Sequence, residues 1–81
     1  MHRYQAWLVY GLIFDLVKEQ NMTSNQVIEL LLSHGWSFVR QRGSHRQYKH
    51  PAKSDRVTVP HPEKDLPKGT VNSILKQAGL K

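Results

Sequence analysis

The sequence predicts an α+β domain in which a helix, three strands and a second helix follow one another. Apolar residues recur at helical spacing near 24–34 and again near 68–78, and three short segments with strand-like alternation lie between these stretches. The short connections favour an antiparallel meander. Two one-sided helices can cover one face of a three-stranded sheet and leave the other face in water.

The first predicted helix covers residues 24–34. Thr23 and Gln26 have the spacing of a capping box, in which a hydroxyl and an amide side chain satisfy backbone donors at the helix start. The apolar stripe that follows consists of Val27, Ile28, Leu30, Leu31 and Leu32, with His34 in the last turn. Gly35 suits the left-handed position that ends a helix, and Trp36 can fold back on that end.

The three predicted strands cover residues 36–41, 45–50 and 56–60, and Gly43-Ser44 supplies the first turn. Alternation in the middle strand puts His45, Gln47 and Lys49 on one face and Arg46, Tyr48 and His50 on the other. Because Tyr48 is the most core-like of the six, we expect its face to be interior and the face of His45 to be open. Arg46 and His50 must then leave the interior at the sheet edges.

The last helix is predicted at 68–78, after a segment that two prolines keep out of helical structure. Its one-sided apolar stripe consists of Val71, Ile74, Leu75 and Ala78. Gly79-Leu80 then repeats the glycine-then-apolar stop of the first helix. The complete order, α-β-β-β-α with both helices on one sheet face, is that of a fold like the double-stranded-RNA-binding domain.

Residues 1–21 differ from the rest, and the predicted domain is therefore 22–81. Residues 6–17 are apolar nearly all round but shorter than the ~20 residues of a membrane span. Three interpretations are open: an extra helix packed on the domain or on a partner, a membrane-surface helix, or a translated upstream stretch with the true start at Met22. The near absence of a polar face argues against the second.

The composition favours a polyanionic partner. Twelve Lys and Arg oppose six Asp and Glu, for a formal net charge of +6, and eight of the twelve lie between residues 40 and 68. Such clustering attracts nucleic acid, although a basic balance can also serve solubility alone. The chain has no cysteine, which excludes a disulfide framework, a zinc–thiolate site and a thiol nucleophile, and which agrees with a cytoplasmic location.

His45 is the candidate for chemistry. It follows the Gly-Ser turn, on the expected open face, among basic residues. Imidazole can take or give a proton near neutral pH, so it could deprotonate an RNA 2′-hydroxyl or protonate the leaving 5′-oxygen. A surface histidine with no such role is the alternative. The residues expected to contact RNA are Arg40, Arg42, Ser44, Arg46 and Lys49.

Other kinds of site find little support in the sequence. A second proton-transfer group could be His50, His61 or Lys49, although His50 and His61 each precede a proline and could be structural, as we expect for His34. We expect no metal and no cofactor, because neither metal-ligand spacing nor a Gly-rich phosphate loop is present. A deep pocket for a small molecule is not expected in so short a chain.

The stretch 23–80 resembles the HicA toxin family. The resemblance rests on several pieces in register, namely Gly35-Trp36, Arg40-Gln41-x-Gly43-Ser44-His45, Tyr48-x-His50-Pro51, Val57-Thr58-Val59-Pro60-His61-Pro62, Asp65-Leu66-Pro67-x-Gly69-Thr70 and Ser73-Ile74-Leu75-Lys76-Gln77-Ala78-Gly79-Leu80. It implies a fold like the double-stranded-RNA-binding domain and a ribosome-independent mRNA interferase of a type II toxin–antitoxin pair. It also implies that His45 is catalytic and that a HicB antitoxin masks it. Residues 1–21 depart from the family pattern.

The prediction is therefore a toxin endoribonuclease that acts on mRNA, with a HicB-type antitoxin as partner and no membrane association. The runner-up is an RNA-binding module that does not cut. A third interpretation is an interaction protein whose basic face holds an acidic partner. Retained binding with lost cleavage after His45→Ala would favour the enzyme over both alternatives.

Overall fold

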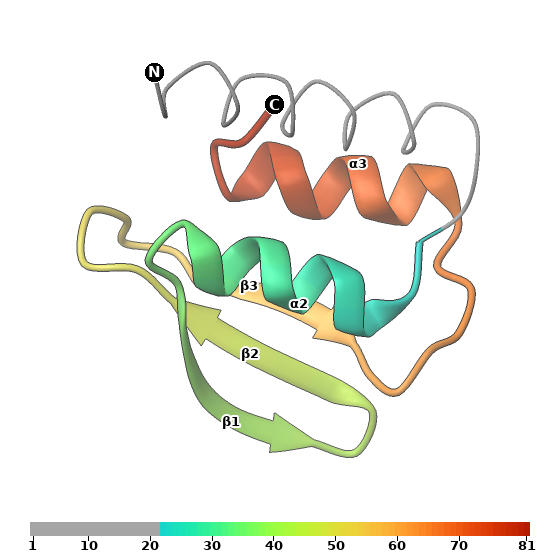
Figure 1. Cartoon of the computed structure of the whole chain (residues 1–81). Coiled ribbons are helices and arrows are strands. Elements are labelled where there is room, and N and C mark those ends of the chain that lie inside the picture. The colour runs from blue at the N-terminus through green and yellow to red at the C-terminus, as the bar shows by residue number, and fades with distance from the viewer. Residues whose placement is uncertain (1–21) are drawn as a thin grey trace.

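The computed structural model describes residues 22–81 (Figure 1). The three interpretations of residues 1–21 lie outside the described residues. All five predicted elements are present, and their ends differ from the predicted ends by at most one residue. They are α2 (Ser24–Ser33), β1 (Ser37–Arg42), β2 (His45–Lys49), β3 (Val57–Pro60) and α3 (Lys68–Gln77).

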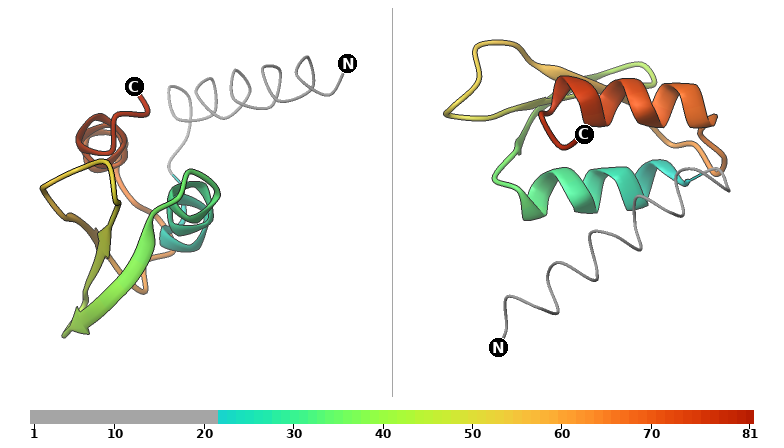
Figure 2. Two further views of the ribbon diagram at one scale, coloured as in Figure 1. Left: turned by 90° about the vertical axis from the view of Figure 1, so that its left-hand side faces the viewer. Right: turned by 90° about the horizontal axis from the view of Figure 1, so that it is seen from above.

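The three strands form an antiparallel sheet in the order β1-β2-β3, as predicted. Both helices pack against β3, whereas β1 makes its main contacts with β2 alone. The end-on view shows α2 and α3 beside the sheet, with β1 extending away from them (Figure 2). The helices therefore shield the β3 side of the sheet and leave the β1 side open.

The core lies between the two helices and the inner face of the sheet. Tyr48, Val57 and Val59 point inward from β2 and β3, and Tyr48 is only 1% exposed, which confirms the interior face predicted for it. The helices and the flanking segments supply Met22, Val27, Ile28, Leu30, Leu31, Leu66, Val71, Ile74, Leu75 and Ala78. Burial of apolar surface on this scale is the main driving force for folding a chain of this size.

Both helix ends follow the local sequence signals. Thr23 and Gln26 form the predicted capping box at the start of α2. Gly35 and Gly79 have φ of 89° and 74°, in the left-handed region that glycine adopts without steric cost. The Trp36 amide then donates to the Leu31 carbonyl in the last turn of α2, and the Leu80 amide donates to the Leu75 carbonyl in the last turn of α3.

The segment between β3 and α3 is fastened to the start of α2. The Leu66 amide donates to the Met22 carbonyl at 2.7 Å, and the Ser24 amide donates to the Glu63 carbonyl at 2.8 Å. The buried Ser24 hydroxyl accepts from the Glu63 amide at 2.9 Å and binds Nδ1 of His61 at 2.8 Å. This segment is irregular in backbone conformation, but hydrogen bonds at His61, Glu63 and Leu66 hold it to the rest of the fold.

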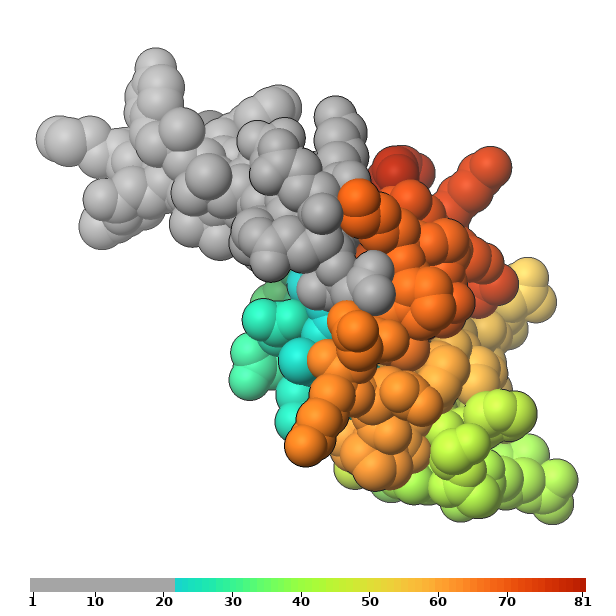
Figure 3. Space-filling view, turned by 90° about the vertical axis from the view of Figure 1, so that its right-hand side faces the viewer, coloured from blue at the N-terminus to red at the C-terminus, as the bar shows by residue number. Residues whose placement is uncertain are grey.

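The strand β1 has no buried residue. Phe38 is 47% exposed, and the pairing register with β2 shifts between Phe38 and Arg40. The space-filling view shows the β1–β2 end, in yellow-green, projecting beyond α3 and the segment that precedes it (Figure 3). The two strands therefore form an arm that extends from the packed part of the domain.

Candidate functional site

The sheet face turned away from the core, called the outer face below, carries a concentration of polar and basic side chains. His45, Gln47 and Lys49 alternate with the inward-facing residues of β2, as predicted. Cross-strand partners share a face, so Arg42 stands opposite His45, and Arg40 stands opposite Gln47. The outer face is completed from the β3 side by Arg56 and Thr58.

A groove of about 580 Å³ runs between the outer side of β3 and α3. Its lining comes from His45, Arg56, Thr58, Pro60, Gly69, Thr70, Ser73, Ile74 and Gln77. His45 is exposed, and its ring makes no hydrogen bond to any residue of 22–81. An imidazole in this position is accessible to a polymer and has both nitrogens available for proton transfer.

Two arginines of the outer face, Arg40 and Arg56, are held by an amide rather than by carboxylates. Arg56 donates from Nη1 to Oε1 of Gln47 at 3.1 Å, and Arg40 donates from Nε to the same oxygen at 3.4 Å. Within residues 22–81 no carboxylate forms an ion pair with these guanidinium groups. Their positive charge is therefore available to an anion from outside the protein.

His50 is bound at both ring nitrogens. Nε2 lies 3.0 Å from the His34 carbonyl, and the Ala52 amide donates to Nδ1 at 2.9 Å. Because Nδ1 accepts, the proton of the neutral ring is on Nε2 and is donated to the carbonyl. The ring also contacts Trp36, with centroids 5.3 Å apart. His50 thus joins the end of β2 to the end of α2 and has no nitrogen left for substrate.

His61 lies on the other side of the sheet from His45. Pro60 is the cross-strand partner of His45, so the next residue, His61, faces the α2 side, where its Nδ1 binds the buried Ser24 hydroxyl. Its amide donates to the Ser44 carbonyl at 2.7 Å and fixes the exposed turn before His45. Of the three expected partners for proton transfer, Lys49 alone shares the outer face with His45.

Arg46 does not join the outer face. Its Cζ lies 4.7 Å from the centroid of the Phe38 ring, and its Nε is buried without a hydrogen-bond partner among the described residues. Burial raises the pKa of the neighbouring Tyr48 phenol, and the charge of Arg46 opposes part of that increase. The arginine that was expected to leave the interior at the sheet edge instead stacks on an aromatic ring.

Several groove residues were not predicted from the sequence. Arg56 and Thr58 could have been placed beside Gln47 if the β2–β3 register had been known, because Gln47 pairs directly with Thr58. Thr70, Ser73 and Gln77 reach the groove only through the way α3 packs beside β3. No local sequence signal reports that packing.

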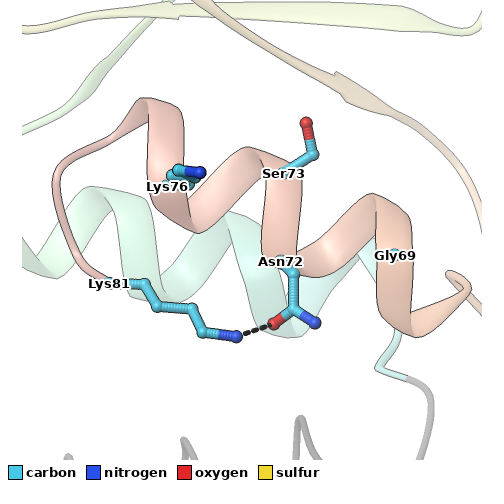
Figure 4. A pocket seen from close by; sticks show the side chains of 5 residues that line it. All are labelled: Gly69, Asn72, Ser73, Lys76 and Lys81. Carbon is cyan, nitrogen blue, oxygen red and sulfur yellow. Dashed lines mark hydrogen bonds between the residues drawn. The ribbon is translucent and has the colours of Figure 1, made fainter.

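A second hollow, of about 520 Å³, lies on the exposed side of α3 (Figure 4). It is lined by Gly69, Asn72, Ser73, Lys76 and Lys81, and the Lys81 ammonium donates to the Asn72 side-chain oxygen at 2.6 Å. Among the described residues, its lining includes two lysines and no imidazole or carboxylate side chain. The groove beside His45 is therefore the better candidate for acid–base chemistry.

Two other kinds of feature are absent from residues 22–81. No three His, Asp or Glu side chains of this range come together as a metal site would require. Neither α2 nor α3 has the length and apolar character needed to cross a membrane.

Two comparisons with known proteins point to toxin–antitoxin systems. Residues 24–80 match the family model described as the HicA toxin of bacterial toxin–antitoxin systems. Among solved structures, a chain described as a toxin–antitoxin complex from Streptococcus pneumoniae is similar at a TM-score of 0.65 and 37% identity. The similarity covers 73% of this chain and 98% of that one. A search of curated proteins found no match.

Proposed function

Because the chain belongs to the HicA toxin family of bacterial toxin–antitoxin systems, we propose that it is an endoribonuclease that cleaves mRNA without the ribosome. The observation that carries the proposal is the position of His45. Its exposed imidazole stands at the groove on a basic face, whereas the rings of His50 and His61 are engaged in packing on the other side of the sheet. Polymer substrates suit an open groove of this kind.

In the proposed reaction His45 takes the proton of a 2′-hydroxyl, and the 2′-oxygen attacks the adjacent phosphorus. The bond from phosphorus to the 5′-oxygen breaks, and that oxygen receives the proton from His45. Lys49 stands at the other end of β2, roughly 13 Å along the strand, and is therefore assigned to binding. Arg42 stands opposite His45 and Arg56 lines the same groove, so both can stabilise the charge that develops on the phosphate. RNA supplies its own nucleophile, and no protein nucleophile is required.

Binding would come mainly from contacts with the RNA backbone. Arg40, Arg42 and Lys49 belong to the outer face, and Ser44 is exposed in the turn beside His45. Contacts of this kind position an RNA strand and make its affinity depend on salt. We assign Arg46 to packing, because its guanidinium covers Phe38 on the opposite face.

The partner of such a toxin would be an antitoxin of the HicB type in the same cytoplasm. Support comes from the similar structure, which is described as a toxin–antitoxin complex. A protein that covers His45 must also cover Arg40, Arg42 and Arg56, which have no carboxylate partner within residues 22–81. We therefore expect acidic side chains in the antitoxin surface that meets the outer face.

The decisive experiment compares cleavage of a defined mRNA, without ribosomes, by the wild type and by His45→Asn. Asparagine keeps a polar side chain but cannot transfer a proton, so cleavage should fall by about 10²- to 10⁴-fold while RNA binding is retained. His34→Asn is the matched control, because His34 caps α2 at the far end of the sheet from the groove. It should cleave as the wild type does.

Two results would contradict the proposal. Equal cleavage by His45→Asn and the wild type would remove His45 from the chemistry. Salt-sensitive RNA binding by a folded wild type that cuts no RNA would instead indicate a binding module, and affinity for an acidic protein without RNA affinity would indicate an interaction protein.

A further inference from the structure

Gln47 connects basic side chains from both neighbouring strands. It lies on β2, the central strand, with Arg40 of β1 on one side and Arg56, just before β3, on the other. Its Oε1 accepts the Nη1 proton of Arg56 at 3.1 Å and the Nε proton of Arg40 at 3.4 Å. One amide oxygen thus brings two guanidinium groups together across the width of the sheet.

The chemistry of the acceptor determines what this cluster can bind. A carboxylate at this position would fix the arginines and also cancel one of their charges. The neutral amide fixes them and leaves both positive charges in place. Each guanidinium has five N–H donors, and one from each is used by Gln47. The ligand that matches the remaining donors is a tetrahedral oxyanion such as a phosphodiester.

The cluster stands beside the candidate active site. Gln47 is two residues from His45 on the same face of β2, which is roughly 7 Å along a strand, and one nucleotide of an RNA backbone can span that distance. Arg56 also lines the groove that contains His45. A chain with one phosphate at His45 would therefore bring the next phosphate to the cluster.

We propose that Arg40, Gln47 and Arg56 form a clamp for the RNA phosphodiester next to the one at His45. Arg40 and Arg56 bind the phosphate, and Gln47 is a positioning residue that acts through them. The location of the scissile phosphate rests on the proposed ribonuclease function, whereas the affinity of the clamp for RNA does not.

The test is a double-mutant cycle on RNA binding in the full chain, with His45→Asn present in every protein to prevent cleavage. The probe is a labelled single-stranded oligouridylate, titrated over a range of KCl concentrations. Arg56→Ala should lower the slope of log affinity against log salt by about 0.7 to 1. Gln47→Leu changes no charge and should still weaken binding by about 3- to 10-fold, because the guanidinium groups lose their common acceptor.

The coupling between the two substitutions decides the role of Gln47. In the Arg56→Ala background, Gln47→Leu should weaken binding less than about 2-fold, because part of what it positions is gone. Lys64→Ala removes one charge from an exposed loop residue and should leave the salt slope unchanged. Gln41→Leu removes an amide that faces the other side of the sheet and should not couple to Arg56.

Three results would overturn the clamp: wild-type affinity for Gln47→Leu, additive effects of Gln47→Leu and Arg56→Ala, or equal slopes for Arg56→Ala and Lys64→Ala. Parallel cleavage assays with His45 intact separate the two proposals. Coupled binding in a protein that cuts no RNA keeps the clamp and rejects the ribonuclease. Cleavage together with additive binding effects keeps the ribonuclease and rejects the clamp. Absence of RNA binding rejects both proposals.

Discussion

The packed part of the domain and the β1–β2 hairpin have opposite compositions. We call the first the body; it comprises α2, β3, α3 and the segment between β3 and α3. It contains most of the buried residues, whereas β1 has none and β2 has Tyr48 alone. The hairpin instead carries five of the seven residues of the outer face, including His45. The comparison indicates that the body provides most of the stability and that the hairpin carries most of the candidate site.

The division follows from the size of the chain. A domain of this length buries only about 60% of the surface that its unfolded chain exposes, so it cannot enclose a pocket inside its core. A hairpin fastened to the body along β3 can remain ordered without burying its own side chains. Substitutions should therefore separate into those that unfold the protein and those that change only its activity.

The largest effect on stability is expected from Leu31→Ala in the body. Leu31 is fully buried, and its truncation should cost about 2–5 kcal/mol of the free energy of unfolding. Its neighbour Leu32 is 50% exposed on the same helix, and Leu32→Ala should change that free energy by no more than about 0.5 kcal/mol. Urea denaturation of the two variants measures both values.

The same pair tests whether activity follows folding. Leu32→Ala should cleave RNA as the wild type does. Leu31→Ala should lose cleavage activity only in proportion to the fraction of the protein that is unfolded. A folded Leu31→Ala protein without activity would show that the body contributes directly to the chemistry.

A smaller effect is expected from Ser24→Ala, where α2 meets the segment that precedes α3. The Ser24 hydroxyl is buried and serves both the Glu63 amide and Nδ1 of His61. Its removal leaves these two groups without their partner and should cost about 1–3 kcal/mol. Ser33→Ala is the control, because the Ser33 hydroxyl bonds the Leu30 carbonyl at the exposed end of α2. Thermal unfolding followed by circular dichroism compares them.

The comparison of Ser24→Ala with Ser33→Ala tests how much the buried hydrogen bonds of Ser24 contribute. If Ser24→Ala and Ser33→Ala lower the unfolding temperature equally, the hydrogen bonds of Ser24 contribute no more to stability than the exposed bond from Ser33 to Leu30. The position of the turn before His45 would then have to rest on the strand pairing alone.

Most of the body could be predicted from the sequence because its signals are local. The capping box at Thr23, the glycines at 35 and 79 and the apolar stripes each specify one element without reference to the others. Tyr48 identified the inner face of β2 because a tyrosine among charged neighbours is the residue that best tolerates burial. The side-chain alternation of a strand then placed His45 outside.

The partners across the sheet could not be predicted, because they depend on register and packing. The bond from Arg56 to Gln47 joins residues nine apart through a pairing that no local motif specifies. The irregular register between Phe38 and Arg40 decides which β1 side chains share the face of His45. The engagement of His61 by Ser24 spans 37 residues and follows only from the folded path of the chain.

A smaller loss of stability than for Ser24→Ala is expected from Phe38→Leu in the hairpin. The Phe38 ring lies under the Arg46 guanidinium and meets Tyr48 edge-on, with ring centroids 6.0 Å apart. Leucine keeps apolar bulk but removes the cation–π contact, which at an exposed site is worth about 0.5–1 kcal/mol. Cleavage should persist, because the contact lies on the face opposite His45. Urea denaturation and an RNA cleavage assay measure the two quantities.

Arg46→Met sharpens this prediction, because it removes the other half of the same contact. The double variant should lose less stability than the sum of the two single losses. If Phe38→Leu instead destabilises the protein as much as Leu31→Ala does, the hairpin is part of the cooperative core. The outer face would then belong to the cooperative core, and substitutions in β1 could not change the activity of His45 without also unfolding the protein.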